Sequence, residues 1–272
     1  MIRVPATSAN LGPGFDALGM ALTLHVEVGI EGVDEIPHGA RSNDDSHPTQ
    51  VAFVRAGGVG RTWATTNIPM GRGLGFSGAA RVAGVVAAEV QQHGSWNFAT
   101  SRALSIGTEL EGHADNVAAS IAGGVVATSA GRIVRVPCAL DVAMVVWVPS
   151  YTTSTSESRT KIGPVVPLDD AVFNIGRTAL LVAALASGDV DALRDATQDR
   201  IHQDMRLAAV PLSRQALDAG LAAGALCGWL SGSGPTIALM CEPSRADAIA
   251  RALPAEGSAK VVRIDNDGVV VL

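Results

Sequence analysis

The stretch that decides the fold is MGRGLGFSGA, residues 70–79, which runs directly into the Ala- and Val-rich segment AARVAGVVAAEV at 79–90. Four of its ten residues are glycine. Glycine lets a backbone approach an anion closely, and the first turn of a following helix offers unpaired N–H groups and the positive end of a dipole. The stretch therefore predicts a phosphate-binding loop at the start of a helix. The alternative is a glycine-rich turn that lets a small-residue helix pack tightly.

Two common glycine-rich motifs are excluded. The loop does not end in Gly-Lys-Ser/Thr, so it is not the common P-loop, and it lacks the dinucleotide fingerprint.

Two further glycine-punctuated segments accompany this loop, PATSANLGPGFD at 5–16 and LSGSGPT at 230–236. The three together resemble the motifs of the GHMP kinase superfamily, and the wording PATSANLGPGFDALGMAL resembles the homoserine kinases within it. Blocks in the middle of the chain follow the same family order, namely EGHADN at 111–116, STSESR at 154–159, NIGRTALLVAALASGD at 174–189 and HQDMR at 202–206.

This resemblance implies a fold and a reaction. The fold is α+β with two domains: residues 1–149, similar to ribosomal protein S5 domain 2 and carrying the ATP loop, and residues 150–272, a ferredoxin-like sandwich. The reaction is transfer of a phosphoryl group from ATP, with Mg²⁺, to the side-chain hydroxyl of L-homoserine in threonine biosynthesis. The resemblance also suggests a homodimer.

The bulk composition is compatible with an enzyme acting on small molecules. The 272 residues are 47% apolar, which is ample for a core, and the net charge of −6 gives no basic footprint for nucleic acid. We see no apolar run of membrane-spanning length and no signal peptide, so we expect a cytoplasmic protein with no membrane partner. The three cysteines, Cys138, Cys227 and Cys241, are widely spaced in apolar contexts and indicate buried, reduced thiols.

Apolar periodicity predicts the order of the elements. We expect a half-buried strand at 24–31, a polar surface loop at 38–50, a helix from 77 to about 92, and a helix from about 113 to 121. These are followed by a hairpin at 125–136, an apolar strand at 142–148, and a domain boundary at Pro149. Beyond the boundary we expect helices at 169–187, 191–205, 212–223 and 245–253, and strands at 226–230, 236–241, 260–264 and 269–272.

The ATP phosphates would be held by backbone N–H groups of the loop. The residues of this nucleotide-binding stretch are Met70, Gly71, Arg72, Gly73, Leu74, Gly75, Phe76, Ser77, Gly78 and Ala79. Mg²⁺ takes few protein oxygens besides phosphate, and by resemblance these come from Ser77 and Glu111. Taken alone, Glu111 could instead be a first-turn carboxylate that complements a helix dipole.

Homoserine carries a carboxylate, an ammonium and a hydroxyl, so its pocket needs a cation, an anion and short polar groups. By resemblance Arg159 and Arg206 hold the carboxylate, a task that suits the guanidinium fork, and Asp16 receives the ammonium. Neighbouring polar contacts match Asn10, His113, Asn116 and Thr155, while Ser231 and Ser233 are further possible contacts. The simpler alternatives are solvated arginines and a His113 that caps a helix.

No residue is an obvious catalytic base. Several GHMP kinases place an Asp against the substrate hydroxyl, whereas homoserine kinases resemble one another in having Asn there, here Asn116. An amide cannot accept a proton as a carboxylate does, which suggests direct transfer assisted by Mg²⁺, Ser77 and Glu111. Asp115 is adjacent, but consecutive helical residues point about 100° apart, so we do not assign it as the base.

The chain departs from the family at two positions of its phosphate loop. The usual wording is Gly-Leu-Gly-Ser-Ser-Ala-Ala, and here Phe76 replaces the first Ser and Gly78 the first Ala. These departures leave two alternatives open: a GHMP kinase for another small hydroxylated metabolite, and a non-catalytic ligand-binding or regulatory protein. The combination of Arg159 and Arg206 with Asp16 argues against the first, and retention of the whole set of site residues argues against the second.

Overall fold

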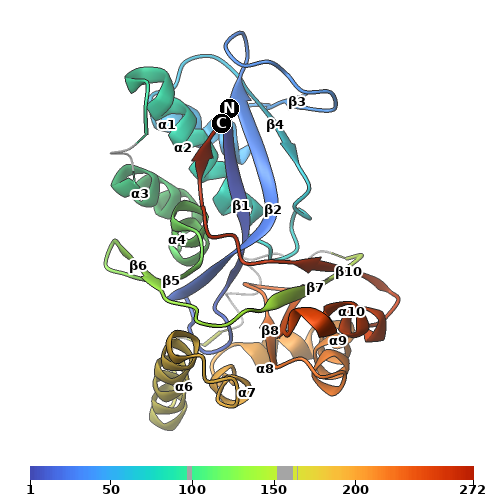
Figure 1. The fold of residues 1–272 in the computed structure, drawn as a ribbon. Coiled ribbons are helices and arrows are strands. Elements are labelled where there is room, and N and C mark those ends of the chain that lie inside the picture. Colours follow the sequence, from blue (N-terminus) through green and yellow to red (C-terminus); the bar gives the residue numbers. More distant parts are fainter. Residues whose placement is uncertain (97–99, 152–161, 164) are drawn as a thin grey trace.

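The computed structural model describes residues 1–96, 100–151, 162–163 and 165–272, and Figure 1 traces the chain through two sheets and their helices. Thr155 and Arg159, two of the residues expected to bind substrate, lie outside the described residues.

The first sheet is built around two long N-terminal strands. Its central path runs β11-β1-β2-β4-β3, and β5 extends from β2 and carries β6. The strands are β1 (Ile2–Ala9), β2 (Leu18–Ile30), β3 (Arg41–Ser42), β4 (Thr62–Thr66), β5 (Val125–Ser129), β6 (Arg132–Val136) and β11 (Val270–Val271). The expected strand at 24–31 is real but begins earlier, because Leu18 to Leu24 continue the pairing with β1 and β5.

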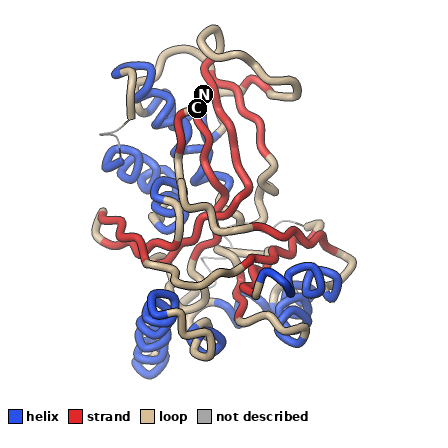
Figure 2. The backbone as a smooth tube through the Cα atoms, viewed as in Figure 1, coloured by secondary structure: helices blue, strands red, loops and turns tan. Residues whose placement is uncertain are grey.

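Helices pack beside this sheet, as the upper half of Figure 2 shows. They are α1 (Pro48–Arg55), α2 (Phe76–His93), α3 (Thr100–Glu111) and α4 (Asp115–Ala122), with α2 and α4 both contacting β1 and β2. The small residues of α2 permit close packing, since a Cβ on Gly84 would lie 2.2 Å from the Thr49 carbonyl oxygen of α1. The prediction for α2 is confirmed, including its end at Gly94, which has φ 71°.

The second sheet has the order β10-β7-β9-β8, all antiparallel. Its strands are β7 (Ala143–Pro149), β8 (Cys227–Leu230), β9 (Ile237–Cys241) and β10 (Gly257–Val262), and α9 (Pro211–Ala222) and α10 (Ala246–Ala252) pack on it. A short 3₁₀ turn, η1 (Pro243–Arg245), precedes α10. Numbered along this half of the chain, the strand order is 4-1-3-2 in a βαββαβ sequence, which is the expected ferredoxin-like arrangement.

Strand β7 is apolar throughout because both of its faces are buried. Met144 and Val146 belong to the core shared with the first sheet, whereas Val145 and Trp147 belong to the core under α9 and α10. This explains why 142–148 shows no polar alternation.

The strand pairing also bears on the division of the chain. Strand β7 ends at Pro149 but pairs with β9 and β10, and β11 returns to pair with β1. The N–H of Leu272 donates to the carbonyl of Met1, and Figure 1 shows the two termini together. The boundary between 1–149 and 150–272 therefore stays a proposal, and the pairing favours grouping β7 with the residues that follow it.

The segment between β7 and α9 contains α6 (Leu168–Ser187), α7 (Leu193–Ala196) and α8 (Gln203–Ala208). The single helix expected at 191–205 is wrong. The Asp199 carboxylate accepts hydrogen bonds from the backbone N–H groups of His202 and Gln203, which starts a new helix and leaves the preceding residues irregular.

Helix α6 presents an uncovered apolar stripe that includes Leu168, Val172 and Ile175, each more than half exposed. It is the one helix in the described part of the chain long and apolar enough to cross a membrane, on length and composition alone. The sequence analysis expected no apolar run of membrane-spanning length, and α6 departs from that expectation in length and composition. A single such helix is weak evidence for a membrane span.

Two smaller expectations have mixed outcomes. The loop expected at 38–50 contains β3 and the first turn of α1, because His47 accepts a hydrogen bond from the N–H of Thr49 and Pro48 suits a first helical position. The cysteine prediction is confirmed for all three as free thiols, of which Cys138 is only partly buried. Burial raises the pKa of the Cys227 thiol to about 12.

Candidate active site

The three glycine-rich loops meet at one cleft. Its lining comes from the loop after β1, from residues 71–77, from the end of α3 and start of α4, from α8, and from the loop after β8. The lining residues are Asn10, Phe15, Asp16, Gly71, Arg72, Gly73, Leu74, Gly75, Phe76, Ser77, Glu111, His113, Asp115, Asn116, Arg206, Gly232 and Ser233.

A relay of hydrogen bonds ties the three loops together. The Trp229 indole N–H donates to the Ser8 hydroxyl at 2.9 Å, which lies 2.8 Å from the Ser231 hydroxyl, and Ser231 donates to the Gly73 carbonyl at 2.6 Å. Because Ser231 has one proton and gives it to a carbonyl, Ser8 must donate to Ser231. Ser231 is fully buried, so it supports the phosphate loop, whereas Ser233 lines the cleft.

The phosphate loop reaches α2 through Gly75, which has φ 65° at the helix N-cap. A Cβ there would lie 1.8 Å from the Thr7 hydroxyl, so this position requires glycine. The Thr7 N–H donates to the Leu74 carbonyl at 3.1 Å, and its hydroxyl donates to Asn116 Oδ1 at 2.6 Å. Sequence reasoning missed Thr7, although it lies inside the quoted segment PATSAN.

The loop residues do not all face the cleft. Residues 71–77 line it, whereas Met70 is largely exposed, and Gly78 and Ala79 are buried. Gly78 faces α4, because a Cβ there would come within 3.3 Å of the Asn116 Cβ. Its lack of a side chain therefore relieves packing between helices rather than opening space for a phosphate.

Arg72 anchors the loop across the two sheets. Its guanidinium donates to the carbonyl oxygens of Pro149 at 3.0 Å, Ser150 at 2.9 Å and Met70 at 3.0 Å. These hydrogen bonds attach the start of the loop, at Met70 and Arg72, to the C-terminal end of β7.

Phe76 is half-buried at the first position of α2 and also lines the cleft. Its ring meets the His47 ring edge to face, with 6.0 Å between centroids, and packs against the first core. Burial lowers the pKa of His47, which keeps this imidazole neutral against the ring. The phenyl ring thus packs beside the loop.

Glu111 is the last residue of α3, so its reading as a first-turn carboxylate is wrong. A carboxylate at a helix C-terminus opposes the dipole. Glu111 is mostly buried and forms an ion pair with Arg81, one turn along α2 from Ser77. Burial lowers the pKa of the Arg81 guanidinium. Sequence reasoning did not identify Arg81.

The donors near Glu111 match the oxygen chemistry of Mg²⁺. A hydroxyl from Ser77 and a carboxylate from Glu111 line the same cleft, and both are hard oxygen ligands. No cluster of three or more His, Cys, Asp or Glu residues occurs among the described residues, so the described chain does not provide a complete protein cage there. The residues present therefore fit a metal ion that also binds phosphate oxygens.

His113, Asp115 and Asn116 form a compact set at the start of α4. Asp115 Oδ1 accepts from the Asn116 N–H at 2.7 Å and lies 2.8 Å from His113 Nδ1. The Asn116 Nδ2 is 3.3 Å from the same oxygen. His113 therefore orients the Asp115 carboxylate and does not cap the helix. Asp115, which the sequence analysis did not assign as a base, also lines the cleft.

The loop after β1 is held in an unusual backbone conformation. Asn10, Leu11 and Asp16 have φ values of 70°, 47° and 56°, which are uncommon for residues other than glycine. Asn10 supports the loop from within, because its Oδ1 accepts from the Asp16 N–H and its Nδ2 donates to the Gly232 carbonyl. Asp16 is thereby presented to the cleft.

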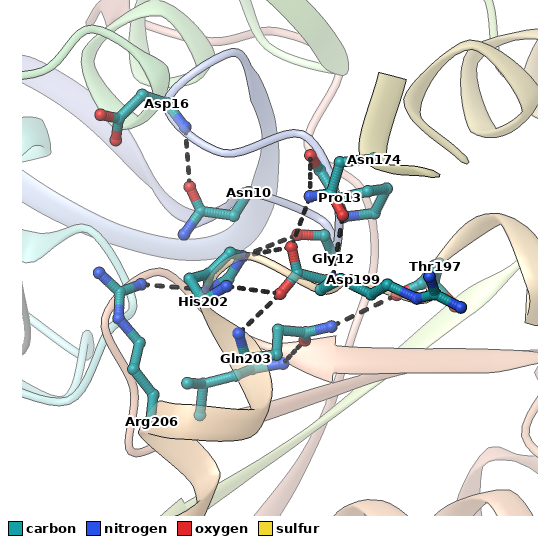
Figure 3. Close-up of polar contacts among 12 residues, drawn as sticks. Asn10, Gly12, Pro13, Asp16, Asn174, Thr197, Asp199, His202, Gln203 and Arg206 are labelled. Atoms are coloured by element: carbon teal, nitrogen blue, oxygen red, sulfur yellow. Dashed lines mark hydrogen bonds and ion pairs between the residues drawn. The ribbon is translucent and has the colours of Figure 1, made fainter. Parts of the chain in front are cut away.

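Arg206 approaches the cleft from α8. Its Nη1 donates to the Gly232 carbonyl at 3.2 Å and lies 3.3 Å from His202 Nδ1. Its guanidinium carbon is 5.4 Å from the centre of the Phe15 ring, within cation–π range. In Figure 3 the Asp16 carboxylate and the Arg206 guanidinium both extend toward the same side of the view.

Around one cleft, the arrangement brings together a glycine-rich backbone segment, the hard oxygens of Ser77 and Glu111, and acidic and basic side chains that include Asp16 and Arg206. The amide of Asn116 lines the same cleft beside Asp115. These features suit transfer of a phosphoryl group to a small zwitterionic acceptor.

Comparison with known proteins agrees with this geometry. The chain matches the GHMP kinases N terminal domain over residues 51–124 and the GHMP kinases C terminal model over residues 181–259. It is 38% identical to a homoserine kinase of Moorella thermoacetica, covering 100% of this chain and 99% of that protein. It is 39% identical to a homoserine kinase of Streptomyces avermitilis, covering 100% and 95%.

A solved structure described as homoserine kinase from Cytophaga hutchinsonii superposes with a TM-score of 0.85 at 26% identity, covering 100% of this chain and 96% of that one. The expected two-domain GHMP fold is confirmed. The chain belongs to the homoserine kinase family of the GHMP kinases.

Proposed function

We propose that this chain is an ATP-dependent kinase that phosphorylates the side-chain hydroxyl of L-homoserine, giving O-phospho-L-homoserine in threonine biosynthesis. The observation that carries this conclusion is the full-length similarity to homoserine kinases, together with the cleft in which the three family motifs meet. The alternative of a GHMP kinase for another metabolite is not favoured.

The phosphate end of the reaction lies at α2. Backbone N–H groups of the loop and the positive end of the α2 dipole stabilise negative charge on the transferred group. Gly73 and Gly75 let the loop pack closely against the Ser231 carbonyl and the Thr7 hydroxyl, which holds its backbone in place, and Ser77 adds a hydroxyl. Mg²⁺, held by Ser77 and Glu111, supplies charge neutralisation of the phosphates when bound.

The substrate end lies between the loop after β1 and α8. Arg206 binds the homoserine carboxylate, and Asp16 binds the ammonium, with Asn10, His113 and Asn116 as neighbouring polar contacts. Arg159 and Thr155 complete the proposed set from outside the described residues. Holding both charged ends of the amino acid fixes the direction in which its hydroxyl points.

The hydroxyl proton has no dedicated acceptor in this proposal. Asn116 is an amide, which does not take up a proton as a carboxylate does, and the hydrogen bonds of Asp115 Oδ1 with the Asn116 N–H and His113 direct that carboxylate toward its own helix start. This supports direct transfer, in which the proton passes to the phosphate or to water, while positioning and charge stabilisation lower the barrier.

A homodimer and a cytoplasmic location belong to the same proposal, with no nucleic acid or membrane as partner. The uncovered apolar stripe of α6 supports self-association, because exposed apolar patches commonly mark interaction sites. Light scattering of the parent protein should give twice the mass of one chain. The variant Val172→Glu should give the mass of a single chain. A monomeric parent protein would contradict the dimer.

The test of the function is a coupled ADP-release assay with purified protein, Mg²⁺ and ATP. The acceptors are L-homoserine, L-serine, L-threonine and mevalonate, with a sample lacking acceptor. ADP release that depends on homoserine supports the proposal. Release with another acceptor would move the substrate assignment, and silence across the panel with measurable ligand binding would favour a non-catalytic protein.

A further inference from the structure

His202 is the most buried titratable group near the cleft that the proposed reaction does not use. Its side chain is fully buried, as is that of Asp199. It lies at the start of α8, one turn before Arg206, and Figure 3 shows it between the loop after β1 and the Arg206 guanidinium.

The two ring nitrogens of His202 face groups of opposite character. Nε2 lies 2.8 Å from the Gly12 carbonyl oxygen, which can only accept a hydrogen bond. Nδ1 lies 3.3 Å from Nη1 of Arg206, which can only donate. The two contacts are satisfied together by one form of the ring, the neutral imidazole with its proton on Nε2 and a lone pair on Nδ1.

The charged form of the ring would oppose this arrangement. An imidazolium would direct an Nδ1–H at a guanidinium N–H inside a buried site, placing two donors and two cations face to face. The charged groups around the ring are Asp199, with Oδ1 3.8 Å from Nε2, together with Arg206 and Asp16. Burial is the largest influence and lowers the pKa of His202, which agrees with the neutral form.

The ring itself is held firmly in place. Asp199 accepts from the backbone N–H groups of His202 and Gln203 at 2.8 and 2.7 Å, and Asn174 donates to the same carboxylate at 2.6 Å. The Phe15 ring lies against the imidazole, with 5.1 Å between centroids. The lone pair on Nδ1 is therefore presented to Arg206 from a fixed position.

We propose that His202 is a positioning residue for Arg206: the Gly12 carbonyl holds the ring in its Nε2–H tautomer, and Nδ1 then orients the guanidinium that binds the substrate carboxylate. This inference rests on the proposed function, which assigns that carboxylate to Arg206. The proposal gives the loop after β1 a second role. The loop presents Asp16 to the cleft, and through the Gly12 carbonyl and His202 it also orients Arg206.

Two substitutions test the roles of the two ring nitrogens of His202 separately. The Oδ1 of an asparagine lies near the position of Nδ1 and can accept from Arg206, whereas the side-chain amide of a glutamine reaches the position of Nε2 and can donate to Gly12. His202→Asn therefore keeps the acceptor for Arg206, and His202→Gln keeps only the anchor to the loop. The two variants are matched controls for each other, because both replace the imidazole ring with a polar side-chain amide.

The experiment measures KM for homoserine, KM for ATP and kcat of the three proteins, with the homoserine Kd from calorimetry and a thermal melt of each. For His202→Gln we expect KM and Kd for homoserine to rise about tenfold, with KM for ATP within about twofold of the parent. For His202→Asn the rise for homoserine should stay below about threefold.

Several results would overturn the inference. One is a larger rise in KM for homoserine in His202→Asn than in His202→Gln, and another is an equal rise of KM for homoserine and for ATP. The others are unchanged kinetics in both variants and failure of both variants to fold. Each of these results assigns the ring a purely structural or a negligible role. Failure of the proposed function is a separate result, since it would appear as no homoserine-dependent ADP from the parent protein. The calorimetric Kd tests His202 in that case as well.

Discussion

Glu111 illustrates how a single residue can be assigned by its surroundings. A carboxylate at the C-terminal end of α3 is unfavourable toward the dipole, and pairing with Arg81 neutralises it in the protein alone. We expect Glu111→Gln to lower kcat by about 100-fold or more while the fold is retained, because it removes a charged ligand for the metal.

Glu109→Gln is the matched control for this prediction. Glu109 lies two residues earlier in α3, is more than half exposed, and pairs with Arg55 at the surface. The dependence of activity on Mg²⁺ concentration should be like that of the parent in Glu109→Gln and weaker than that of the parent in Glu111→Gln. Full activity of Glu111→Gln, with circular dichroism of both variants like the parent, would remove Glu111 from the site.

Phe76 stands where the usual wording of the family's phosphate loop has its first serine. Because its ring packs on the first core and against His47, we expect Phe76→Ser to reduce stability by about 1–2 kcal/mol. It should keep or improve ATP affinity, since it restores a hydroxyl beside the phosphates. KM for ATP and a thermal melt measure the two effects, and a marked rise in KM would show that the ring shapes the loop.

At the scale of elements, the relay from Trp229 through Ser8 and Ser231 to Gly73 joins β8, β1 and the phosphate loop. Ser231→Ala leaves the buried Ser8 hydroxyl without its acceptor and the Gly73 carbonyl without its donor. We expect a loss of about 1–3 kcal/mol in unfolding free energy and a larger rise in KM for ATP than for homoserine.

Chemical denaturation and steady-state kinetics measure these two effects. Ser105→Ala is the control, because Ser105 is exposed on α3 and belongs neither to the relay nor to the cleft lining. Equal KM values for Ser231→Ala and the parent would mean that the relay does not position the loop.

At the scale of the whole molecule, buried histidines link stability to pH. Burial lowers the pKa of both His202 and His47 below the value of 6.5 expected in the unfolded chain. Between these values the unfolded chain binds more protons than the folded one, so their contribution is fully present above about pH 6.5 and is lost as pH falls through the lowered pKa values.

We therefore expect the free energy of unfolding to fall as the pH is lowered below about 6.5, by at most about 1.4 kcal/mol per pH unit for each histidine. Urea titrations at three pH values check this, with His202→Gln expected to show a shallower dependence. A stability that is flat or rises on acidification would contradict the assignment of buried, neutral rings.

Much of the fold could be predicted from sequence because its signals are local. Helix α2 follows from its glycine loop and its end at Gly94, the hairpin β5–β6 from the turn at Gly131, and the second sheet from apolar strands separated by helices. Helices α1 and α3 were missed because the start of α1 lies in a polar segment and α3 carries few strongly apolar residues. The helix expected at 191–205 failed because Asp199 caps the backbone of residues 202 and 203.

The sequence by itself determined the family, and it predicted the phosphate loop and most of the candidate site residues, because glycine positions and short polar motifs carry their constraints within a few residues. Only the tertiary structure decided which of them meet. Thr7 and Asn116 are 109 residues apart, and Ser231 and Gly73 are 158 apart. The pairing of Arg81 with Glu111 and the tautomer of His202 likewise depend on how elements pack, since burial and the direction of each donor are set by neighbours distant in the chain.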